Sequence, residues 1–484
     1  MKRNAFLLVI LIIIYNCTPN YQSKKYPADI EEKIKQVENN LAGWVQTGSN
    51  DRWNLTERMK QYGINGVSIA VIHNYKIEWA RGYGFADVSE KRPVTEATLF
   101  QAASISKSLN SLGVLKLVQE KKLNLDTDIN NYLSSWKFPY DEKSNNRPIT
   151  LKNLLSHTGG LTIHGFPGYS RGDTLPTLLQ ILDGQKPANT EAVRSSTEPG
   201  KNVIYSGGGT TITQQIILDI TRQPYDVFMK KNVLDPLGMT ASSFTQPPEK
   251  MKEVLLATGY KADGIEVPGK YHIYPEQAAA GLWTNPTDLC KYIIETQLSY
   301  KGESSRVLTP EMTRLRVTPV LEDAALGTFV KSRVTGSYKY FNHNGGNEGF
   351  SCMSTGCLDN GEGVVIMTNS DNPSILEEIA NSVASVYNWK HYYLPEKKKV
   401  VNVDKSVLEK YTGKYDFNGT QITITMSDTG LSVNPFGNVR WQLFFTSDSD
   451  FFVRESAGMA KFRTGKDSKV KGFVSDGQLL KKIE

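Results

Sequence analysis

The chain contains little cysteine and little histidine, which limits the disulfide and metal chemistry open to it. Its 484 residues include four cysteines and six histidines. Beyond Cys17, near the N-terminus, the cysteines are Cys290, Cys352 and Cys357. This odd number argues against a disulfide framework, and no cysteine–histidine cluster has the spacing of a metal site. We therefore predict buried thiols, no metal ion and no cofactor, although Cys352 and Cys357 could pair.

The sequence also lacks any concentration of charge of one sign. Lysine and arginine number 56 and aspartate and glutamate 50, a net charge of +6, with the basic residues scattered along the chain. Nucleic-acid-binding domains gather their positive charge on one face or along one helix. We therefore exclude nucleic acid as a partner and interpret the excess of positive charge as ordinary solvated surface.

Long hydrophobic runs are missing too, apart from a short one near the N-terminus. Residues 6–14 are all apolar, too few for the about 20 that span a bilayer but enough for the core of a secretion signal. Cys17 follows at the position of the lipidated cysteine in bacterial lipoprotein signals, although Asn16 stands where a small residue is usual. We predict a lipoprotein-type signal at residues 1–17, a tether at 18–28 and a bacterial cell-envelope location. Simple secretion is the alternative.

The composition is that of a folded protein, with 39% hydrophobic and 10% aromatic residues. The length favours two or three domains. Strand patterns at 66–72, at 77–83 and within 326–368 flank a region of helical patterns broken by loops, and a last helix is expected over 374–387. We predict an α+β domain at residues 29–394. Its antiparallel sheet would be built from both ends of the segment and flanked by helices, with an inserted helical region.

The C-terminal part of the chain has a linker pattern followed by strand patterns. Pro395 and the run Lys397-Lys398-Lys399 indicate a linker at 395–403. Beyond it, apolar residues alternate with polar ones and turn residues separate the runs, as in Ile422, Ile424 and Met426. This period of two predicts a small all-β domain of the barrel type at 404–484.

A serine and a lysine three positions apart lie in the segment 101–109, which ends a strand pattern and begins an amphipathic helix pattern. On a helix, Ser104 and Lys107 would share a face. A lysine shielded from water can lose its proton near neutral pH and then accept the serine proton, while the helix N-terminus favours negative charge. The same spacing recurs at Ser134–Lys137 and Ser468–Lys471, so the spacing alone does not identify a site.

Two glycine-rich segments could supply the remaining parts of an acyl-transfer site. Tyr205 precedes Ser206 and three glycines at the start of a helix pattern, where its phenol could carry a proton. His343 ends a strand pattern and is followed by Asn344 and two glycines before the next strand, where a backbone N–H could bind an oxyanion. Taken singly, either residue would be an ordinary structural one.

Together these segments resemble the β-lactamase-like serine hydrolases, which include class C β-lactamases, D-alanyl-D-alanine carboxypeptidases, penicillin-binding proteins and related esterases. The resemblance covers residues 66–388, and the C-terminal unit resembles the lipocalin-like barrel that often follows such hydrolases. The segments occur in the family's order: Ala103-Ser104-Ile105-Ser106-Lys107, Leu154-Leu155-Ser156-His157-Thr158-Gly159-Gly160-Leu161, Tyr205-Ser206-Gly207, Pro236-Leu237-Gly238-Met239, Gly281-Leu282-Trp283-Thr284 and His343-Asn344-Gly345.

The resemblance implies a role for each motif. Ser104 would be the nucleophile, Lys107 its base and Tyr205 the proton carrier for the leaving group, although the sequence leaves open which of the last two is the base. The backbone N–H groups of Ser104 and Gly346 would form the oxyanion hole. In the Leu154–Leu161 segment, His157 is expected to be structural.

Two departures from the family pattern bear on the substrate. Gly207 stands where the family has an asparagine, and His343 stands where it has a strand-borne lysine beside the site. Gly207, Asn344 and Gly345 are expected to contact substrate. A mostly neutral histidine binds a carboxylate more weakly than lysine does, so both changes weaken the case for an efficient β-lactamase.

We therefore expect a serine hydrolase that cleaves an ester or peptide bond through an acyl-enzyme on Ser104. Its substrate would be a small molecule or a peptide, such as one containing a D-amino acid, and a lipid would hold the enzyme at the membrane. The alternatives are a β-lactamase or D-Ala-D-Ala carboxypeptidase, and a non-catalytic penicillin-binding-like sensor. A dehydrogenase is excluded because Gly82-Tyr83-Gly84 precedes no helix pattern. The sequence does not indicate an oligomeric state.

Overall fold

The computed structural model describes residues 24–48, 51–332, 334, 337–417, 419–435, 439–475 and 477–484. The predicted signal and Cys17 lie outside these residues, so lipidation stays a prediction. Within the described part of the chain, no helix is both long and apolar enough to cross a bilayer. Cys290, Cys352 and Cys357 are free and buried, as expected.

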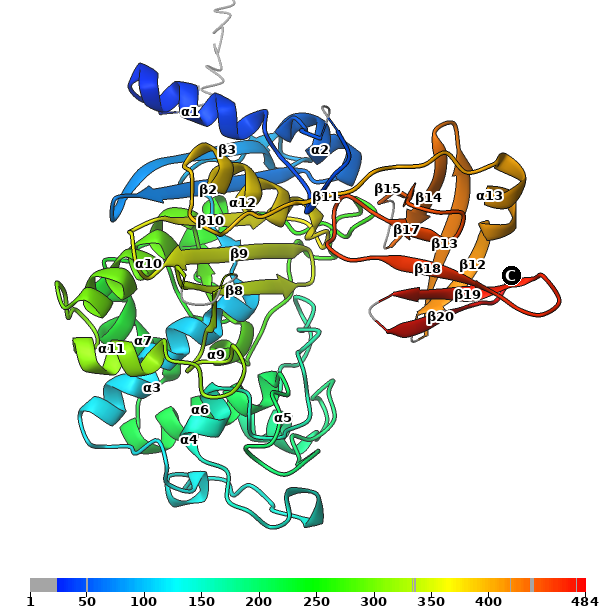
Figure 1. Cartoon of the computed structure of the whole chain (residues 1–484). Coiled ribbons are helices and arrows are strands. Elements are labelled where there is room, and N and C mark those ends of the chain that lie inside the picture. Colours follow the sequence, from blue (N-terminus) through cyan, green and yellow to red (C-terminus); the bar gives the residue numbers. More distant parts are fainter. Residues whose placement is uncertain are drawn as a thin grey trace, which may run out of the picture.

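A seven-stranded antiparallel sheet forms the centre of the larger unit, in the order β4-β3-β2-β10-β9-β8-β7 (Figure 1). Its strands come from both ends of the predicted segment, which confirms the fold class. Their bounds are β2 (Gly66–His73), β3 (Lys76–Asp87), β4 (Arg92–Pro93), β7 (Phe329–Lys331), β8 (Tyr340–Asn347), β9 (Phe350–Cys357) and β10 (Gly363–Thr368).

Alternate side chains of the sheet enter two separate cores, because successive residues of a strand point to opposite faces. Val67, Ile69 and Val71 of β2 pack with α1 (Ala28–Glu38), α2 (Leu55–Tyr62) and α12 (Ser374–Val386). Ala70 and Ile72 pack on the other side, where α3 (Ser106–Gln119) and α10 (Pro286–Lys301) lie. The sheet is therefore a middle layer, with the inserted helical region on one side (Figure 1).

The inserted region consists mostly of short helices with side-chain caps. Thr150 and Thr177 each form a capping box, and Asn285 accepts a hydrogen bond from the backbone N–H of Asp288, which satisfies otherwise unpaired N–H groups at the helix starts. The helices are α4 (Leu151–Leu155), α5 (Leu178–Asp183), α6 (Gly207–Thr221), α7 (Tyr225–Met229), α8 (Asp235–Leu237), α9 (Gln277–Ala280) and α11 (Pro310–Arg316), with the π-helical segment η4 (Lys230–Leu234) after α7.

The prediction that the helix after Ser104 is amphipathic was wrong. Residues 106–115 of α3 are all buried, including the five polar ones from Ser106 to Ser111. These polar groups bond to partners that are distant in sequence: the Ser108 hydroxyl donates to the Gly327 carbonyl at 2.7 Å and the Asn110 amide donates to Thr213 Oγ1 at 2.8 Å. The helix can therefore lie inside the molecule, because burying a polar group costs little when it is hydrogen-bonded.

Nine antiparallel strands form the C-terminal unit, in the order β15-β14-β13-β12-β20-β19-β18-β17-β16. The two edge strands, β15 (Trp441–Gln442) and β16 (Phe444–Phe445), are separated by only Leu443, so the sheet curls into a nearly closed barrel, as predicted. The other bounds are α13 (Lys405–Tyr411), β12 (Gly413–Phe417), β13 (Thr420–Ser427), β14 (Gly430–Asn434), β17 (Asp450–Phe452), β18 (Ala460–Thr464), β19 (Val470–Ser475) and β20 (Gln478–Lys482).

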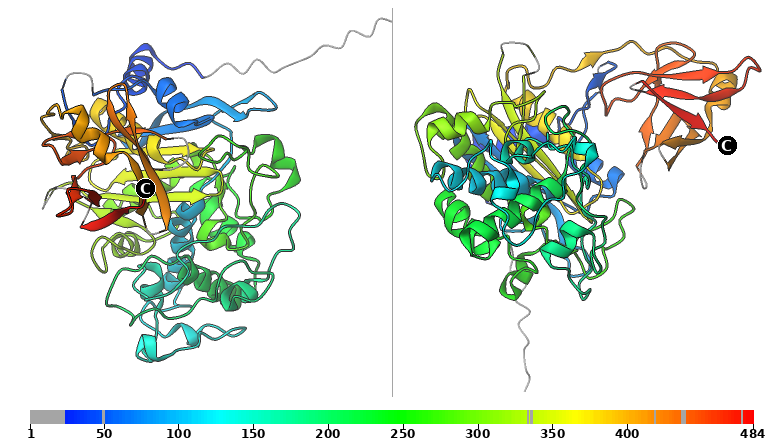
Figure 2. Two further views of the ribbon diagram at one scale, coloured as in Figure 1. Left: turned by 90° about the vertical axis from the view of Figure 1, so that its right-hand side faces the viewer. Right: turned by 90° about the horizontal axis from the view of Figure 1, so that it is seen from below.

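The barrel stands beside the larger unit and is fastened to it by charged contacts (Figure 2). Arg58 of α2 is buried between Glu378 of α12 and Glu455 of the barrel, at 2.8 Å from Glu378 Oε2 and 3.2 Å from Glu455 Oε1. Arg454 forms a second ion pair with Asp51 at 3.0 Å. Within the predicted linker, β11 (Glu396–Lys397) pairs with β1 (Val45–Gln46). The domain limits themselves stay predictions.

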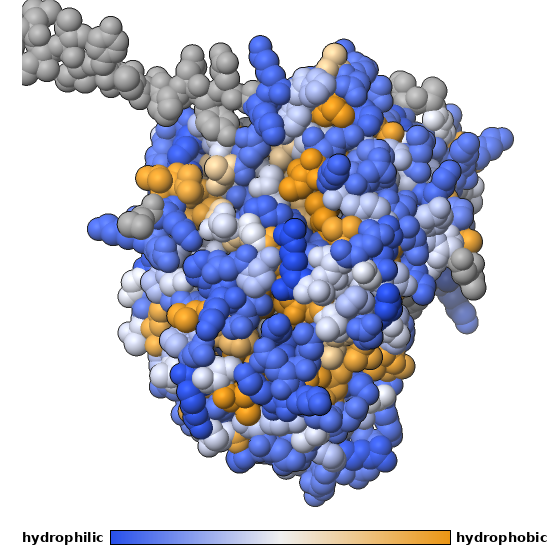
Figure 3. All heavy atoms as spheres, turned by 90° about the vertical axis from the view of Figure 1, so that its left-hand side faces the viewer, coloured by the Kyte–Doolittle hydropathy of each residue, from blue (hydrophilic) through white to orange (hydrophobic). Residues whose placement is uncertain are grey.

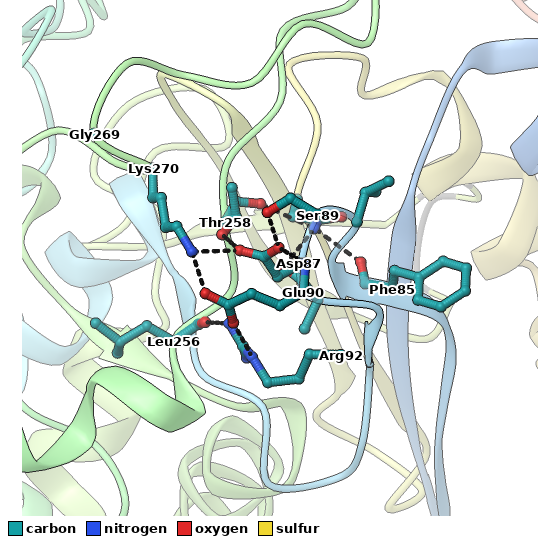
Figure 4. A network of polar contacts seen from close by, with 12 residues as sticks. Phe85, Asp87, Ser89, Glu90, Arg92, Leu256, Thr258, Gly269 and Lys270 are labelled. Atoms are coloured by element: carbon teal, nitrogen blue, oxygen red, sulfur yellow. Dashed lines mark hydrogen bonds and ion pairs between the residues drawn. The ribbon is translucent and has the colours of Figure 1, made fainter. Parts of the chain in front are cut away.

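A buried carboxylate fixes the loop that leads toward α9 (Figure 4). Asp87, at the end of β3, accepts hydrogen bonds from Thr258 Oγ1 at 2.6 Å and Lys270 Nζ at 2.7 Å. Burial alone would raise the pKa of Asp87, but the hydrogen bonds from Lys270 and Thr258 hold it well below its usual value. The carboxylate therefore stays charged and holds the loop from Thr258 to Lys270 on the sheet.

One face of the molecule is shown by hydropathy in Figure 3. Hydrophilic residues cover most of it, and hydrophobic residues are gathered in small separate patches. Small separate apolar patches are common on folded protein surfaces.

Candidate active site

Ser104 lies in a single 3₁₀ turn, η1 (Ala103–Ile105), between β5 (Phe100–Gln101) and the start of α3 at Ser106. The turn is tight: Ala103 has a φ of +46°, in the left-handed region that residues with a side chain rarely adopt. Strand β8 packs directly on it. A Cβ atom at Gly345 would lie 2.4 Å from the Ala102 carbonyl oxygen, so glycine is required there for β8 to approach the turn.

Lys107 points back from the first turn of α3 to the serine. Its Nζ donates hydrogen bonds to Ser104 Oγ and to the Ala279 carbonyl oxygen, both at 2.8 Å. Among the residues that the structure describes, no carboxylate forms an ion pair with this ammonium. Burial therefore lowers the pKa of Lys107 to about 7, so a large share of the side chain is a free amine at neutral pH.

Tyr205 reaches the same point from the loop before α6. Ser206 caps that helix, its Oγ accepting from the Gly209 N–H at 2.9 Å and donating to the Thr162 carbonyl at 2.7 Å. The Lys107 Nζ lies 5.0 Å from the centroid of the Tyr205 ring. Burial raises the pKa of the Tyr205 phenol, and its hydrogen bond with Ser104 opposes that shift. Tyr205 is therefore a neutral phenol that can donate its proton.

His343 lies in the middle of β8, which corrects the prediction that it ends a strand. The strand continues through Gly345 and Gly346 to Asn347, and the turn is at Glu348-Gly349. The His343 Nδ1 is 2.6 Å from the Asn344 carbonyl oxygen, so Nδ1 carries the proton. Its Nε2 is buried without a partner in the described structure. Burial and the Lys107 charge lower the pKa of His343 to about 3, so the imidazole is neutral.

The strand geometry turns the Gly346 N–H toward the open edge of β8. In antiparallel pairs, N–H groups point alternately toward and away from the partner strand. Leu358 N–H donates to the Lys339 carbonyl, which places Gly346 among the residues that point away from β9. On that side β7 pairs only as far as Asn342, and a Cβ at Gly346 would meet nothing within 4 Å. The position suits the predicted oxyanion donor.

Aromatic rings surround the Tyr205 phenol. The centroid of its ring lies 4.3 Å from that of His157, 4.8 Å from His164, 6.1 Å from His343 and 6.4 Å from Phe329. The His157 Nδ1 accepts from the Ser206 N–H at 3.2 Å, and burial lowers the pKa of its ring well below the usual value. His157 is thus a neutral structural residue, as expected, whereas His164 and Phe329 were not predicted to lie here.

These groups open into a cavity of about 690 Å³, within the size range of small-molecule sites. Gly207 is not among the lining residues. It is buried, its N–H donates to the His164 carbonyl at 3.0 Å, and a Cβ there would lie 3.1 Å from Phe166. The structure therefore does not support the predicted substrate contact at Gly207. The lining residues are Ser104, His164, Gly165, Phe166, Tyr205, Asp323, Phe329, Lys331, Asn342, His343, Asn344, Gly345 and Gly346.

Two charged residues lie in the lining that no sequence motif indicated. Lys331 Nζ is 2.9 Å from Asp323 Oδ2, and the two side chains are 58% and 31% exposed. Phe329 and Lys331 are two residues apart on β7 and so share one face of the strand. Lys331 therefore extends along the cavity wall from the ring of Phe329, and the ion pair is partly open to solvent.

Residues 53–387 match the family model described as Beta-lactamase. This match spans more than half of the chain, and the protein belongs to the β-lactamase family. It is accordingly a serine hydrolase of that family. The C-terminal barrel lies beyond the matched residues.

Similar proteins are found among curated sequences and solved structures. Penicillin-binding protein 4* of Bacillus subtilis (strain 168) is 23% identical over 442 residues, which cover 86% of this chain and 93% of that protein. Protein flp of Staphylococcus aureus (strain N315) is 25% identical over 390 residues, covering 78% and 72%.

Two solved structures show the same fold. The octameric penicillin-binding protein homologue from Pyrococcus abyssi has a TM-score of 0.60 at 22% identity, covering 85% of this chain and 95% of that one. A D-amino acid amidase from Ochrobactrum anthropi SV3, complexed with L-phenylalanine amide, has a TM-score of 0.57 at 21% identity, covering 75% and 98%.

Proposed function

We propose that the protein cleaves an ester or peptide-type amide bond through an acyl-enzyme on Ser104, with Lys107 as the base. The observation that carries this proposal is the 2.8 Å contact between Lys107 Nζ and Ser104 Oγ at a lysine whose pKa is about 7. A general base works best when its pKa lies near the working pH. The raised pKa of the Tyr205 phenol favours Lys107 over Tyr205 for this role.

The proposed reaction specifies the donor and the acceptor of each proton. The free amine of Lys107 takes the Ser104 hydroxyl proton as Oγ attacks the substrate carbonyl. The backbone N–H groups of Ser104 and Gly346 stabilise the oxyanion that forms. Tyr205 then donates its proton to the leaving amine or alkoxide and recovers a proton from the Lys107 ammonium. Water, deprotonated by the same groups, hydrolyses the acyl-enzyme.

The charges around the cavity favour a substrate with a free amino group. His343 replaces a cation with a neutral ring whose unpartnered Nε2 can only accept a hydrogen bond. His343 therefore offers no positive charge to the carboxylate of a penicillin or of a D-Ala-D-Ala terminus, and the ammonium of Lys331 is paired with Asp323. The Asp323 carboxylate can bind an ammonium group instead. We propose aminoacyl amides or esters, with a D-amino acid on the acyl side. The fold shared with a D-amino acid amidase supports this choice.

The test of this proposal is to locate the covalent intermediate. The protein is incubated with a fluorophosphonate probe or with a D-aminoacyl ester, quenched in acid and digested, and the modified peptide is identified by mass spectrometry. We expect one adduct, on the peptide that contains Ser104. An adduct on another residue, or none from any acyl compound, contradicts the proposal, and the latter result would support a non-catalytic sensor. Faster turnover of a chromogenic cephalosporin than of aminoacyl compounds would favour the β-lactamase alternative.

The Asp323–Lys331 pair gives a sharper prediction about the substrate. Asp323→Asn should lower kcat/KM for D-phenylalanine p-nitroanilide about tenfold, near the lower end of the about 1.5–3 kcal/mol of a charged hydrogen bond. Lys331→Gln should raise it by about threefold, since it frees the carboxylate from its partner. The N-acetylated substrate is the control and should respond to neither change. Equal effects on both substrates would show that Asp323 does not bind the amine.

We also place the enzyme in the bacterial cell envelope, held by a lipid on Cys17. This proposal rests on the apolar run at residues 6–14 and the cysteine that follows it. A mass spectrum of the mature N-terminus tests it, because an unmodified Cys17 or an intact residue 1 would contradict lipidation.

A further inference from the structure

The C-terminal barrel contains a cavity of its own, of about 410 Å³. Among the residues that the structure describes, none that lines it is charged, and most of the lining is apolar. They belong to β13, β14, β15, β17, β18, β19 and β20, to the position after β14 and to the segment between β17 and β18. The lining residues are Ile422, Ile424, Val433, Pro435, Trp441, Phe451, Phe452, Val453, Ser456, Ala457, Gly458, Met459, Ala460, Phe473, Ser475, Gln478 and Leu480.

Aromatic rings fill only part of the barrel interior. Tyr411 and Phe462 stack with their ring centroids 3.8 Å apart, and Phe445 lies against Phe462 at 6.4 Å. Phe451 and Phe473 belong to this aromatic core and also line the cavity. The remaining space is bounded by aliphatic side chains, of which Ile422, Ile424 and Leu480 are buried. Nearly closed barrels of this size have interiors that either are packed with side chains or hold one small ligand.

We propose that the barrel cavity binds the hydrocarbon part of a lipid or of another uncharged apolar molecule. Apolar side chains without partner atoms lose dispersion contacts, which a hydrocarbon restores. Apolar cavities smaller than this one stay free of water and take up apolar compounds. Its volume lies within the range of small-molecule sites. The described part of the lining offers no charge to an ammonium or a carboxylate, whereas Asp323 and Lys331 line the cavity at Ser104.

Polar atoms in the lining restrict the head group of such a ligand. Ser456, Ser475 and Gln478 are the hydrogen-bonding side chains around the cavity besides the indole of Trp441. Neutral hydroxyl and amide groups suit a hydroxyl or ester head group better than an ionised one. The geometry therefore points to a neutral acyl compound, such as a monoacylglycerol, ahead of a free fatty acid.

The larger unit holds one side of this cavity in place. Ser456 and Ala457 directly follow Arg454 and Glu455, whose side chains form ion pairs with Asp51 and Arg58. The lining therefore depends on contacts with the larger unit, and binding must be measured on the full chain.

Fluorescence of N-phenyl-1-naphthylamine tests the site. The full chain carrying Cys17→Ser, which keeps attached lipid from competing, should bind one probe per molecule with a Kd in the micromolar range. Monooleoylglycerol should displace the probe, oleate should do so more weakly, and D-phenylalanine amide should not. Prior modification of Ser104 by a fluorophosphonate should leave binding unchanged. Loss of probe binding after that modification would show that the probe binds in the catalytic cavity, and it would overturn the proposal.

Two substitutions connect binding to this cavity. Val433→Trp fills it and should raise the probe Kd at least tenfold. Ala457→Trp, at an exposed lining residue whose replacement does not disturb the core, should raise it too. Val401→Trp adds the same bulk at an exposed position outside the lining and should change nothing. An unchanged Kd in both cavity variants, or no probe binding by the parent chain, contradicts the proposal.

Discussion

Replacement of Ser104 by alanine should reduce kcat/KM by about four to six orders of magnitude, the range seen when a nucleophilic serine is removed. The Ser104 Oγ contacts the amine of Lys107 and the phenol of Tyr205 rather than the hydrophobic core. The variant should therefore unfold at nearly the same temperature as the parent protein. Hydrolysis of a D-aminoacyl ester, together with labelling by a fluorophosphonate probe, measures the effect.

The chain contains a matched control for this experiment. Ser134 and Lys137 have the same spacing as Ser104 and Lys107, but Ser134 is exposed and accepts a hydrogen bond from Arg222 at 3.3 Å. Lys137 bonds instead to the Asn130 carbonyl at 2.5 Å. Ser134→Ala should leave both turnover and labelling unchanged. Hydrolysis that persists in Ser104→Ala at the parent rate would remove Ser104 from the mechanism.

The sheet could be predicted from the sequence because its signal is local. The run of β-branched residues at 66–72 and the apolar run of β10 match the observed strands, and β10 has the predicted bounds Gly363–Thr368. The helix α3 could not be predicted correctly, because serines and asparagine normally indicate a solvent-facing side. Here their hydrogen-bond partners lie more than a hundred residues away, which local patterns cannot show.

The candidate site also contains residues that local motifs predict and residues that they do not. Ser104, Lys107, Tyr205 and His343 could be found because each belongs to a short motif. The structure places Ser104, Tyr205 and His343 in the lining of one cavity, with the buried Lys107 hydrogen-bonded to Ser104. Asp323, Lys331 and Phe166 belong to no motif, and only the packing of β7 and of the 164–166 segment puts them beside Ser104. The sequence predicts that His343 ends a strand, whereas Gly345 and Gly346 continue β8. Gly345 allows the close approach of β8 to the nucleophile's turn, which a local pattern does not reveal.

The same packing explains the replacement of lysine by histidine on β8. A second cation at position 343 would lie near Lys107, and like charges lower each other's pKa. The neutral His343 removes that repulsion, and burial alone is the cause that brings the pKa of Lys107 to about 7. Lys107 is therefore the amine whose protonation activity should follow near pH 7.

Replacement of Lys107 by arginine should have the second-largest effect, a loss of about two to four orders of magnitude in kcat/KM, as when a general base is removed. In the parent protein the active form is the free amine. Because the pKa of Lys107 is about 7, kcat/KM should rise about tenfold per pH unit below 7 and level off above 8. Arginine stays protonated throughout this range, so its residual activity should lack this rise. The measurement is kcat/KM between pH 5 and 9 for an N-acetylated D-aminoacyl amide, because a free α-amino group would itself titrate in this range.

A rise in activity near pH 7 could also come from a histidine, whose ordinary pKa is about 6.5, so His343→Gln provides the discriminating control. The pKa of His343 is lowered to about 3, which keeps the ring neutral across the whole measured range. His343→Gln should therefore lower activity by altering substrate binding while the midpoint of the profile stays near 7. If the rise disappears in His343→Gln and persists in Lys107→Arg, then His343 is the base, and the 2.8 Å contact between Lys107 and Ser104 only positions the nucleophile.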